Sequence, residues 1–185
     1  MDLVRTLKSR LLGFKQDQAG AASVEFVIIA PLYFALMLST FEAGWLMTKS
    51  MMLERGMDLT MRDLRLGVYP NPTHAQMKTI ICDNAAILKD CEASMLLELV
   101  PIATASDVPK ASDTVCRDRS SPTDPTPTVT FNTTRGDRVL ETMYVRACVM
   151  VDPLVPGIGL ALHLPKDATG GIAMVSYGAF VNEPS

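Results

Sequence analysis

The feature that most constrains this chain is an apolar run that begins at Phe26 and contains no charged residue before Glu42. Extended to Thr48, the run has about 23 residues and would form a helix roughly 34 Å long, at about 1.5 Å per residue. The hydrocarbon core of a bilayer is about 30 Å thick. We therefore expect this segment to cross a membrane as a single helix. Glu42, near its outer end, is expected to reach the headgroups, which costs less, or else to line a helix bundle.

The leader before this run, "MDLVRTLKSRLLGFKQDQAG", holds four basic residues against two acidic ones. Segments with an excess of Lys and Arg next to a membrane helix stay in the cytoplasm. We expect the N-terminus to be cytoplasmic and everything after Thr48 to lie on the far side of the membrane.

Small residues that suit a processing site, Ala19-Gly20-Ala21, come before the apolar run and not after it. A secretory signal peptide has the opposite order, so its apolar stretch is lost on cleavage. Cleavage after Gly20 would remove the basic leader and leave a mature chain that starts with its membrane helix. The alternative is a signal-anchor that is never processed.

Glu25 is an acid at the beginning of this membrane-length helix, and it would be the fifth residue of a chain that starts at Ala21. A lone acid in a bilayer is costly and is usually paired. The helix macrodipole alone favours an anion in the first turn. A new α-ammonium group on Ala21 of a neighbouring subunit is a second, more specific partner.

The stretch "GAASVEF" resembles the prepilin-peptidase site of the type IVc (tight adherence, Flp) pilin family: Gly20, four residues, Glu25 and the aromatic Phe26. Three further features resemble the TadE-type pseudopilins of that system: Pro31 in the apolar run, "FEAGW" near its end, and the closing "SYGAFVNEP".

This resemblance implies a minor pilin-like subunit that acts in assembly of tight adherence pili, and thereby in surface attachment and biofilm formation. Its partners would be prepilin peptidase, other pilin-like subunits and the assembly machinery in the inner membrane, and the lipid bilayer. The expected parts are a cleaved leader (1–20), a transmembrane and stalk helix (21–67) and a periplasmic domain (68–185). The competing interpretation is an uncleaved single-pass protein with a periplasmic sensing or scaffolding domain.

Beyond the membrane the pattern predicts an α+β, type IV pilin-like arrangement: a long helix followed by a small antiparallel sheet with one further helix. The long helix should continue to a stop at Gly67. An apolar stripe along it either packs on its own domain, which we favour, or receives a neighbouring helix. The stripe comprises Met47, Met51, Leu53, Met57, Met61 and Leu64.

A second helix is predicted over residues 74–88, with Thr73 and Gln76 forming a capping box. Strands are predicted at "SMLLELV", "TVTF" (128–131), 142–151 and 171–181, with a Pro-rich loop over 101–128. In the strand 142–151, alternate residues from Val145 to Val151 form an apolar face. In the strand 171–181, the alternate residues from Ala173 to Val181 share one side.

Four cysteines, Cys82, Cys91, Cys116 and Cys148, lie beyond the apolar run, and none forms a CxxC pair. Two disulfides in an oxidising compartment are a better interpretation than zinc. Four cysteines allow three connectivities. We favour Cys82 with Cys91, which requires the second helix to end before Cys91, and Cys116 with Cys148, which would fasten the Pro-rich loop to the sheet.

Composition and motifs argue against other classes of function. The net charge is −3 and the basic residues form no dense cluster, so we expect no nucleic-acid partner. No catalytic motif or phosphate-binding loop is present, so we expect neither an enzyme nor a cofactor or metal. The two histidines are isolated: His74 is expected to be a solvated residue at a helix start, and His163 a partly buried loop residue.

Overall fold

The computed structural model describes residues 19–69, 72–110, 114–121, 141–157 and 159–182. Most of the leader and the predicted strand at 128–131 lie outside these residues. The described part combines a long helix with a three-stranded antiparallel sheet and short helices, so the α+β prediction is confirmed.

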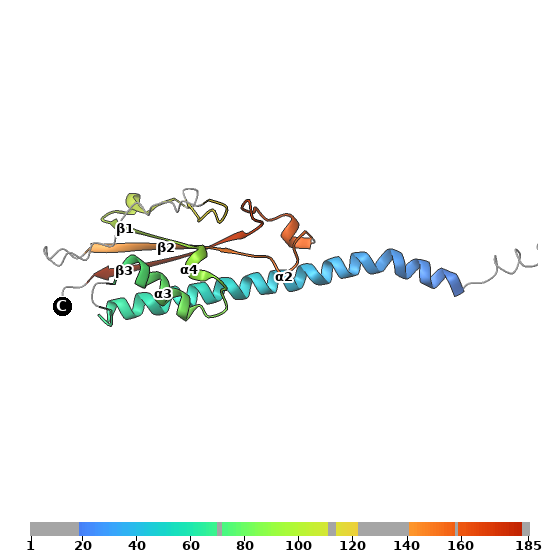
Figure 1. Cartoon of the computed structure of the whole chain (residues 1–185), viewed down its shortest axis with the longest axis horizontal. Helices are drawn as coiled ribbons and strands as arrows, with labels where there is room; N and C mark the ends of the chain where they lie inside the picture. Colours follow the sequence, from blue (N-terminus) through green and yellow to red (C-terminus); the bar gives the residue numbers. More distant parts are fainter. Residues whose placement is uncertain (1–18, 70–71, 111–113, 122–140, 158, 183–185) are drawn as a thin grey trace, which may run out of the picture.

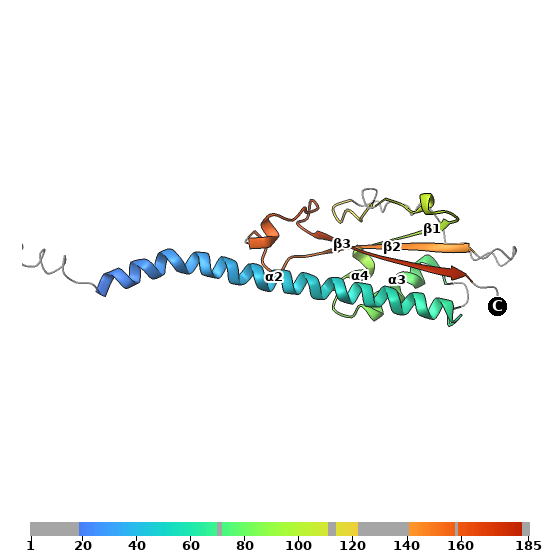
Figure 2. The ribbon, with the colours of Figure 1, turned by 180° about the vertical axis from the view of Figure 1, so that it is seen from behind.

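The long helix α2 (Ala19–Arg65) has 47 residues, which corresponds to about 70 Å at about 1.5 Å per residue. Its N-terminal part projects alone, while its C-terminal half lies along the sheet (Figures 1 and 2). The helix ends as predicted at Gly67, which has φ 69°. The N–H groups of Gly67 and Val68 donate to the carbonyls of Leu64 and Asp63, which is the Schellman pattern of helix termination.

The sheet contains β1 (Met95–Ile102), β2 (Glu141–Val151) and β3 (Ile172–Asn182) in the order β1-β2-β3. Helices α2 and α3 (His74–Asn84) cover one face (Figures 1 and 2). The segment that follows β1 runs along the other face and includes η1 (Ala105–Asp107). Pro101, which we had assigned to a loop, lies within β1. β1 is an edge strand, where proline is tolerated.

The core lies between α2, α3 and the inner face of the sheet. The predicted apolar face of β2 is buried there. The stripe on α2 is only partly confirmed: Leu53, Met57 and Met61 are in the core, but Met47 and Met51 are about two-thirds exposed (66% and 67%). As predicted, alternate residues of β3 lie on the same side of the strand. The side that contains Tyr177 faces outward, and the side that contains Phe180 faces the helices.

Helices α2 and α3 approach closely at Gly56, where an added Cβ would be 2.7 Å from the carbonyl oxygen of Ile81. The predicted capping box of α3 is present at Thr73 and Gln76. α3 ends at Asn84, before the predicted residue 88, and the chain turns back through Asp90 in a left-handed conformation.

This reversal brings Cys91, the first residue of the short helix α4 (Cys91–Ser94), close to Cys82. The Cα atoms of the two cysteines are 5.7 Å apart, and their side chains form a disulfide. The second disulfide joins Cys116 to Cys148, with a Cα–Cα distance of 5.3 Å. Both favoured pairings are therefore confirmed.

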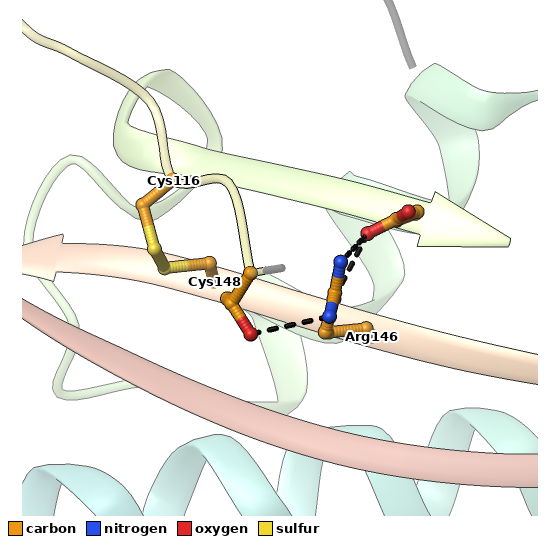
Figure 3. Close-up of a disulfide and its surroundings, with 5 residues drawn as sticks. Cys116, Arg146 and Cys148 are labelled. Carbon is orange, nitrogen blue, oxygen red and sulfur yellow. Dashed lines mark hydrogen bonds and ion pairs between the residues drawn. A yellow bond between two sulfur atoms is a disulfide. The ribbon is translucent and has the colours of Figure 1, made fainter. Parts of the chain in front are cut away.

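The outer face of the sheet is held to the overlying segment by a buried arginine as well as by this disulfide (Figure 3). Arg146, 2% exposed, forms an ion pair with its cross-strand neighbour Glu98. The guanidinium also donates to the carbonyl oxygen of Lys110 at 3.2 Å and to the hydroxyl of Thr114 at 3.1 Å. The predicted attachment of the loop to the sheet thus has a covalent and a polar component.

Candidate processing and assembly segment

The N-terminal part of α2 is apolar on every side and has large hydrophobic side chains in contact with solvent. Val24, Phe26, Val27, Ile28 and Ile29 are each between 61% and 70% exposed. The helix over residues Ser23–Arg65 is long and apolar enough to cross a membrane. A helix that is hydrophobic all round needs an apolar surrounding, and the chain's own domain does not supply one here.

The predicted processing residues lie in the first turns of this helix. Gly20 is the second residue of α2, and a Cβ placed there would meet no heavy atom within 4 Å. Glu25 and Phe26 lie on the same projecting segment, and both are exposed. No residue that the structure describes forms a hydrogen bond or ion pair with the Glu25 carboxylate.

Glu42, the second acid of the apolar run, has a different environment. We had expected it to reach the headgroups or to line a helix bundle, and this was wrong. Its side chain is fully buried, and the two carboxylate oxygens accept hydrogen bonds of 2.9 Å from the backbone N–H groups of Leu154 and Val155. The connection between β2 and β3 folds back onto α2 and supplies the partners that the acid needs.

The same connection contacts α2 at neighbouring positions. Gly159, at φ 64°, approaches the helix so closely that a Cβ would be 2.1 Å from the Ser39 hydroxyl oxygen. Lys49 donates to the carbonyl oxygen of Asp152 at 3.0 Å and lies over the Trp45 ring. The contacts between α2 and the connection join residues more than 100 positions apart, so no local sequence signal indicated them.

Arg119, Asp152 and Asp167 form a cluster of ion pairs, here called the polar clip, that joins the two ends of this connection. Arg119 forms ion pairs with Asp152 at 2.7 Å and with Asp167 at 3.2 Å. Burial raises the pKa of Asp167, but hydrogen bonds from Arg119, from the Gly171 N–H and from the Thr169 hydroxyl outweigh it and hold that pKa below its usual value.

The histidines do not form a site. Contrary to expectation, His74 is half-buried and its Nε2 atom lies 2.8 Å from the carbonyl oxygen of Leu97, while His163 is exposed. Within the described ranges, no group of three His, Cys, Asp or Glu side chains is arranged to hold a metal ion.

The residues that define the projecting segment and the first half of the stalk also carry a family signature. A family model described as TadE-like protein matches residues 20–57. The match covers 38 of the 185 residues, so the similarity to TadE-like proteins applies to this segment of the chain. The match begins at Gly20, includes Glu25, Phe26 and Glu42, and ends at Met57 in the core.

This TadE-like assignment is consistent with a pilin-like subunit and indicates the context of the Tad pilus machinery. The family is generally not enzymatic. The single N-terminal apolar helix suggests a membrane anchor. No curated protein and no solved structure matches the chain.

Proposed function

We propose that this chain is the precursor of a minor pilin-like subunit that acts in assembly of tight adherence pili for surface attachment and biofilm formation. Prepilin peptidase cleaves it after Gly20, so that the leader 1–20 is removed and Ala21 becomes the first residue. Residues 21–67 serve as membrane anchor and stalk, and residues 68–185 form the periplasmic domain. The subunit resides in the inner membrane and enters the extracellular pilus on assembly.

The observation that carries this proposal is the contrast between the two acids of the apolar helix. Glu42 is satisfied by the chain's own backbone, whereas Glu25 is exposed on a projecting apolar helix. An ionised group in an apolar medium is retained where it has a partner. The α-ammonium group of Ala21 on a neighbouring subunit supplies a positive charge four positions from Glu25 in sequence, at the same end of a parallel helix.

Two measurements test the proposal. The intact mass of protein extracted from its native membrane should correspond to a chain that starts at Ala21. A start at Met1 in cells with an active prepilin peptidase would instead favour the uncleaved single-pass anchor.

The second measurement replaces Glu25 by Gln, which keeps the shape of the side chain and removes its charge. Glu25→Gln should leave the amount of processed protein in the membrane unchanged and reduce its incorporation into pili. The matched control is Glu54→Gln, because Glu54 is an exposed acid on the stalk part of the same helix. Normal piliation with Glu25→Gln would refute the role of the charge in assembly.

A further inference from the structure

The connection between β2 and β3 forms an apolar lobe, described over residues 153–157 and 159–165, which lies against α2 at the base of the projecting segment (Figures 1 and 2). We propose that this lobe lies in the interfacial layer of the outer leaflet, where it covers Glu42 and inserts its apolar side chains beside the helix. This inference rests on the membrane-spanning placement of α2 in the proposed function, and it assigns the lipid bilayer as the partner of a second part of the chain.

The first argument is length. The lobe contacts α2 from Ser39 onward, through Gly159 and through Glu42. The charge-free helix before these contacts, residues 26–38, has thirteen residues and measures roughly 20 Å at about 1.5 Å per residue. This is about 10 Å less than the hydrocarbon thickness of a bilayer. The apolar run fills that thickness only when it is inserted beyond Ser39, and the lobe then enters the outer leaflet with it.

The second argument is the composition and orientation of the lobe. Residues 153–165 contain no Asp, Glu, Lys or Arg. The lobe directs the backbone N–H groups of Leu154 and Val155 inward to the Glu42 carboxylate. It directs apolar side chains outward, and those of Leu154 and Leu162 are 56% and 60% exposed. The exposed His163 lies on the same lobe. Irregular backbone that faces lipid does not occur in the hydrocarbon centre, so this mixture of outward apolar side chains and a polar one suits the interfacial layer, where apolar side chains insert and polar groups stay near water and headgroups.

The third argument is the charge just above the lobe. Lys49 follows Glu42 by seven residues, or about 10 Å along the helix axis. Together with Trp45 it lines a hollow of about 620 Å³, whose charged side chains are Lys49, Lys89, Arg117 and Arg119 against Asp90 and Asp152, an excess of two positive charges. Aromatic and basic residues at this level match the headgroup region, where Trp anchors a helix and cations attract lipid phosphates. The charge pattern therefore places the outer membrane boundary between Trp45 and Lys49.

The experiment uses the full chain in vesicles of phosphatidylcholine and phosphatidylglycerol whose acyl chains are brominated close to the headgroup. Trp45 is the chain's only tryptophan, so its fluorescence reports the depth of the helix directly. In a Trp45→Phe background, Leu162→Trp reports the lobe. Val108→Trp is the control, because Val108 is also exposed but follows η1 on the opposite face of the sheet. Leu154→Trp provides a second report from the lobe, and formation of both disulfides is checked in each variant.

We expect the brominated lipid to remove most of the emission of Trp45 and of the Leu162→Trp variant, and to leave the Val108→Trp variant unaffected. Aqueous acrylamide should give the reverse order. Quenching of Trp45 without quenching of the Leu162→Trp and Leu154→Trp variants would overturn the lobe proposal and leave the spanning helix intact. If the lipid fails to quench Trp45 as well, the membrane placement on which both proposals rest is wrong. The Glu25→Gln piliation test separately decides the assembly role.

Discussion

The contact between Glu42 and the lobe allows a quantitative prediction for Glu42→Gln. Both carboxylate oxygens are engaged, each by one backbone N–H at 2.9 Å. Glutamine has nearly the same shape, but only its carbonyl oxygen accepts a hydrogen bond. Its NH₂ group would face the other N–H, so one donor is left without an acceptor inside a contact that is buried.

The magnitude follows from the two bonds. A hydrogen bond to a charged group contributes about 1.5–3 kcal/mol, a neutral one about 0.5–1.5 kcal/mol, and an unsatisfied buried donor costs about 1–3 kcal/mol. A neutral amide is cheaper to bury than a carboxylate, which offsets part of the loss. We therefore expect the lobe to dock less favourably by about 2–3 kcal/mol. At about 1.4 kcal/mol for each factor of ten, the lobe opens roughly 30- to 140-fold more often.

Hydrogen–deuterium exchange with mass spectrometry measures this opening in the peptide that contains Leu154 and Val155. Exchange there should accelerate in Glu42→Gln, while exchange in β1 and β2 should remain as in the unsubstituted chain. Glu54→Gln is the matched control on the same helix. If the protection of the Leu154 and Val155 amides is the same in Glu42→Gln as in the unsubstituted chain, the carboxylate does not hold the lobe, and the reasoning is refuted.

Three further predictions concern contacts within the folded part of the chain. Gly56→Ala should destabilise the folded state by about 1–3 kcal/mol, since the added methyl meets a carbonyl of α3, and a thermal melt that is unchanged would contradict the close approach. Arg146→Met should cost about 3 kcal/mol in chemical denaturation because it leaves Glu98 unpaired, and replacing both residues by Met should recover most of that loss. The pKa of Asp167 is lowered, so its ionised carboxylate stabilises the polar clip. This contribution is present above the ordinary Asp pKa of 3.8 and is lost as the pH falls through the lowered pKa of Asp167. A pH titration of the Gly171 amide by NMR should show the transition in acid, and a shift that begins near neutral pH would contradict it.

Local sequence signals were sufficient where the structure depends on neighbours in the chain. The capping box of α3 and the glycine that ends α2 are set by residues a few positions apart, and both were predicted correctly. The Cys82–Cys91 pairing was one of three possible connectivities. The spacing showed only that this favoured pairing requires the helix to end before Cys91, because nine residues on one continuous helix are incompatible with disulfide geometry, and α3 does end at Asn84.

Alternation failed to identify the buried face of β3, because both faces of this strand carry apolar residues. The packing partner decides the face. Gly178 points at α2, where an added Cβ would be 3.2 Å from the Cγ atom of Met61. A side chain at position 178 would press on Met61, so the helix-facing side has its glycine there, between the buried Met174 and Phe180, and Tyr177 lies on the outer face. This choice depends on which helix the strand packs against, and it is absent from the strand's own pattern.

The role of Glu42 was misjudged for a related reason: its partners lie 112 and 113 residues away in the chain. In the sequence, Glu25 and Glu42 are both acids in a membrane-length apolar helix, and the sequence left several possible partners open for each. The structure shows that the fold itself solves the problem for one of them.

That result strengthens the argument for Glu25. An acid in the hydrocarbon centre costs about 2.5–3.5 kcal/mol on insertion scales, and less towards the interface where Glu25 would lie. The isolated subunit bears this cost or keeps Glu25 at the headgroups, whereas a neighbour that brings an α-ammonium group to it removes the penalty. Each tenfold gain in association requires only about 1.4 kcal/mol, so a partial penalty is enough to favour assembled over isolated helices. Glu42 adds nothing to this preference, because its hydrogen bonds are complete within one chain.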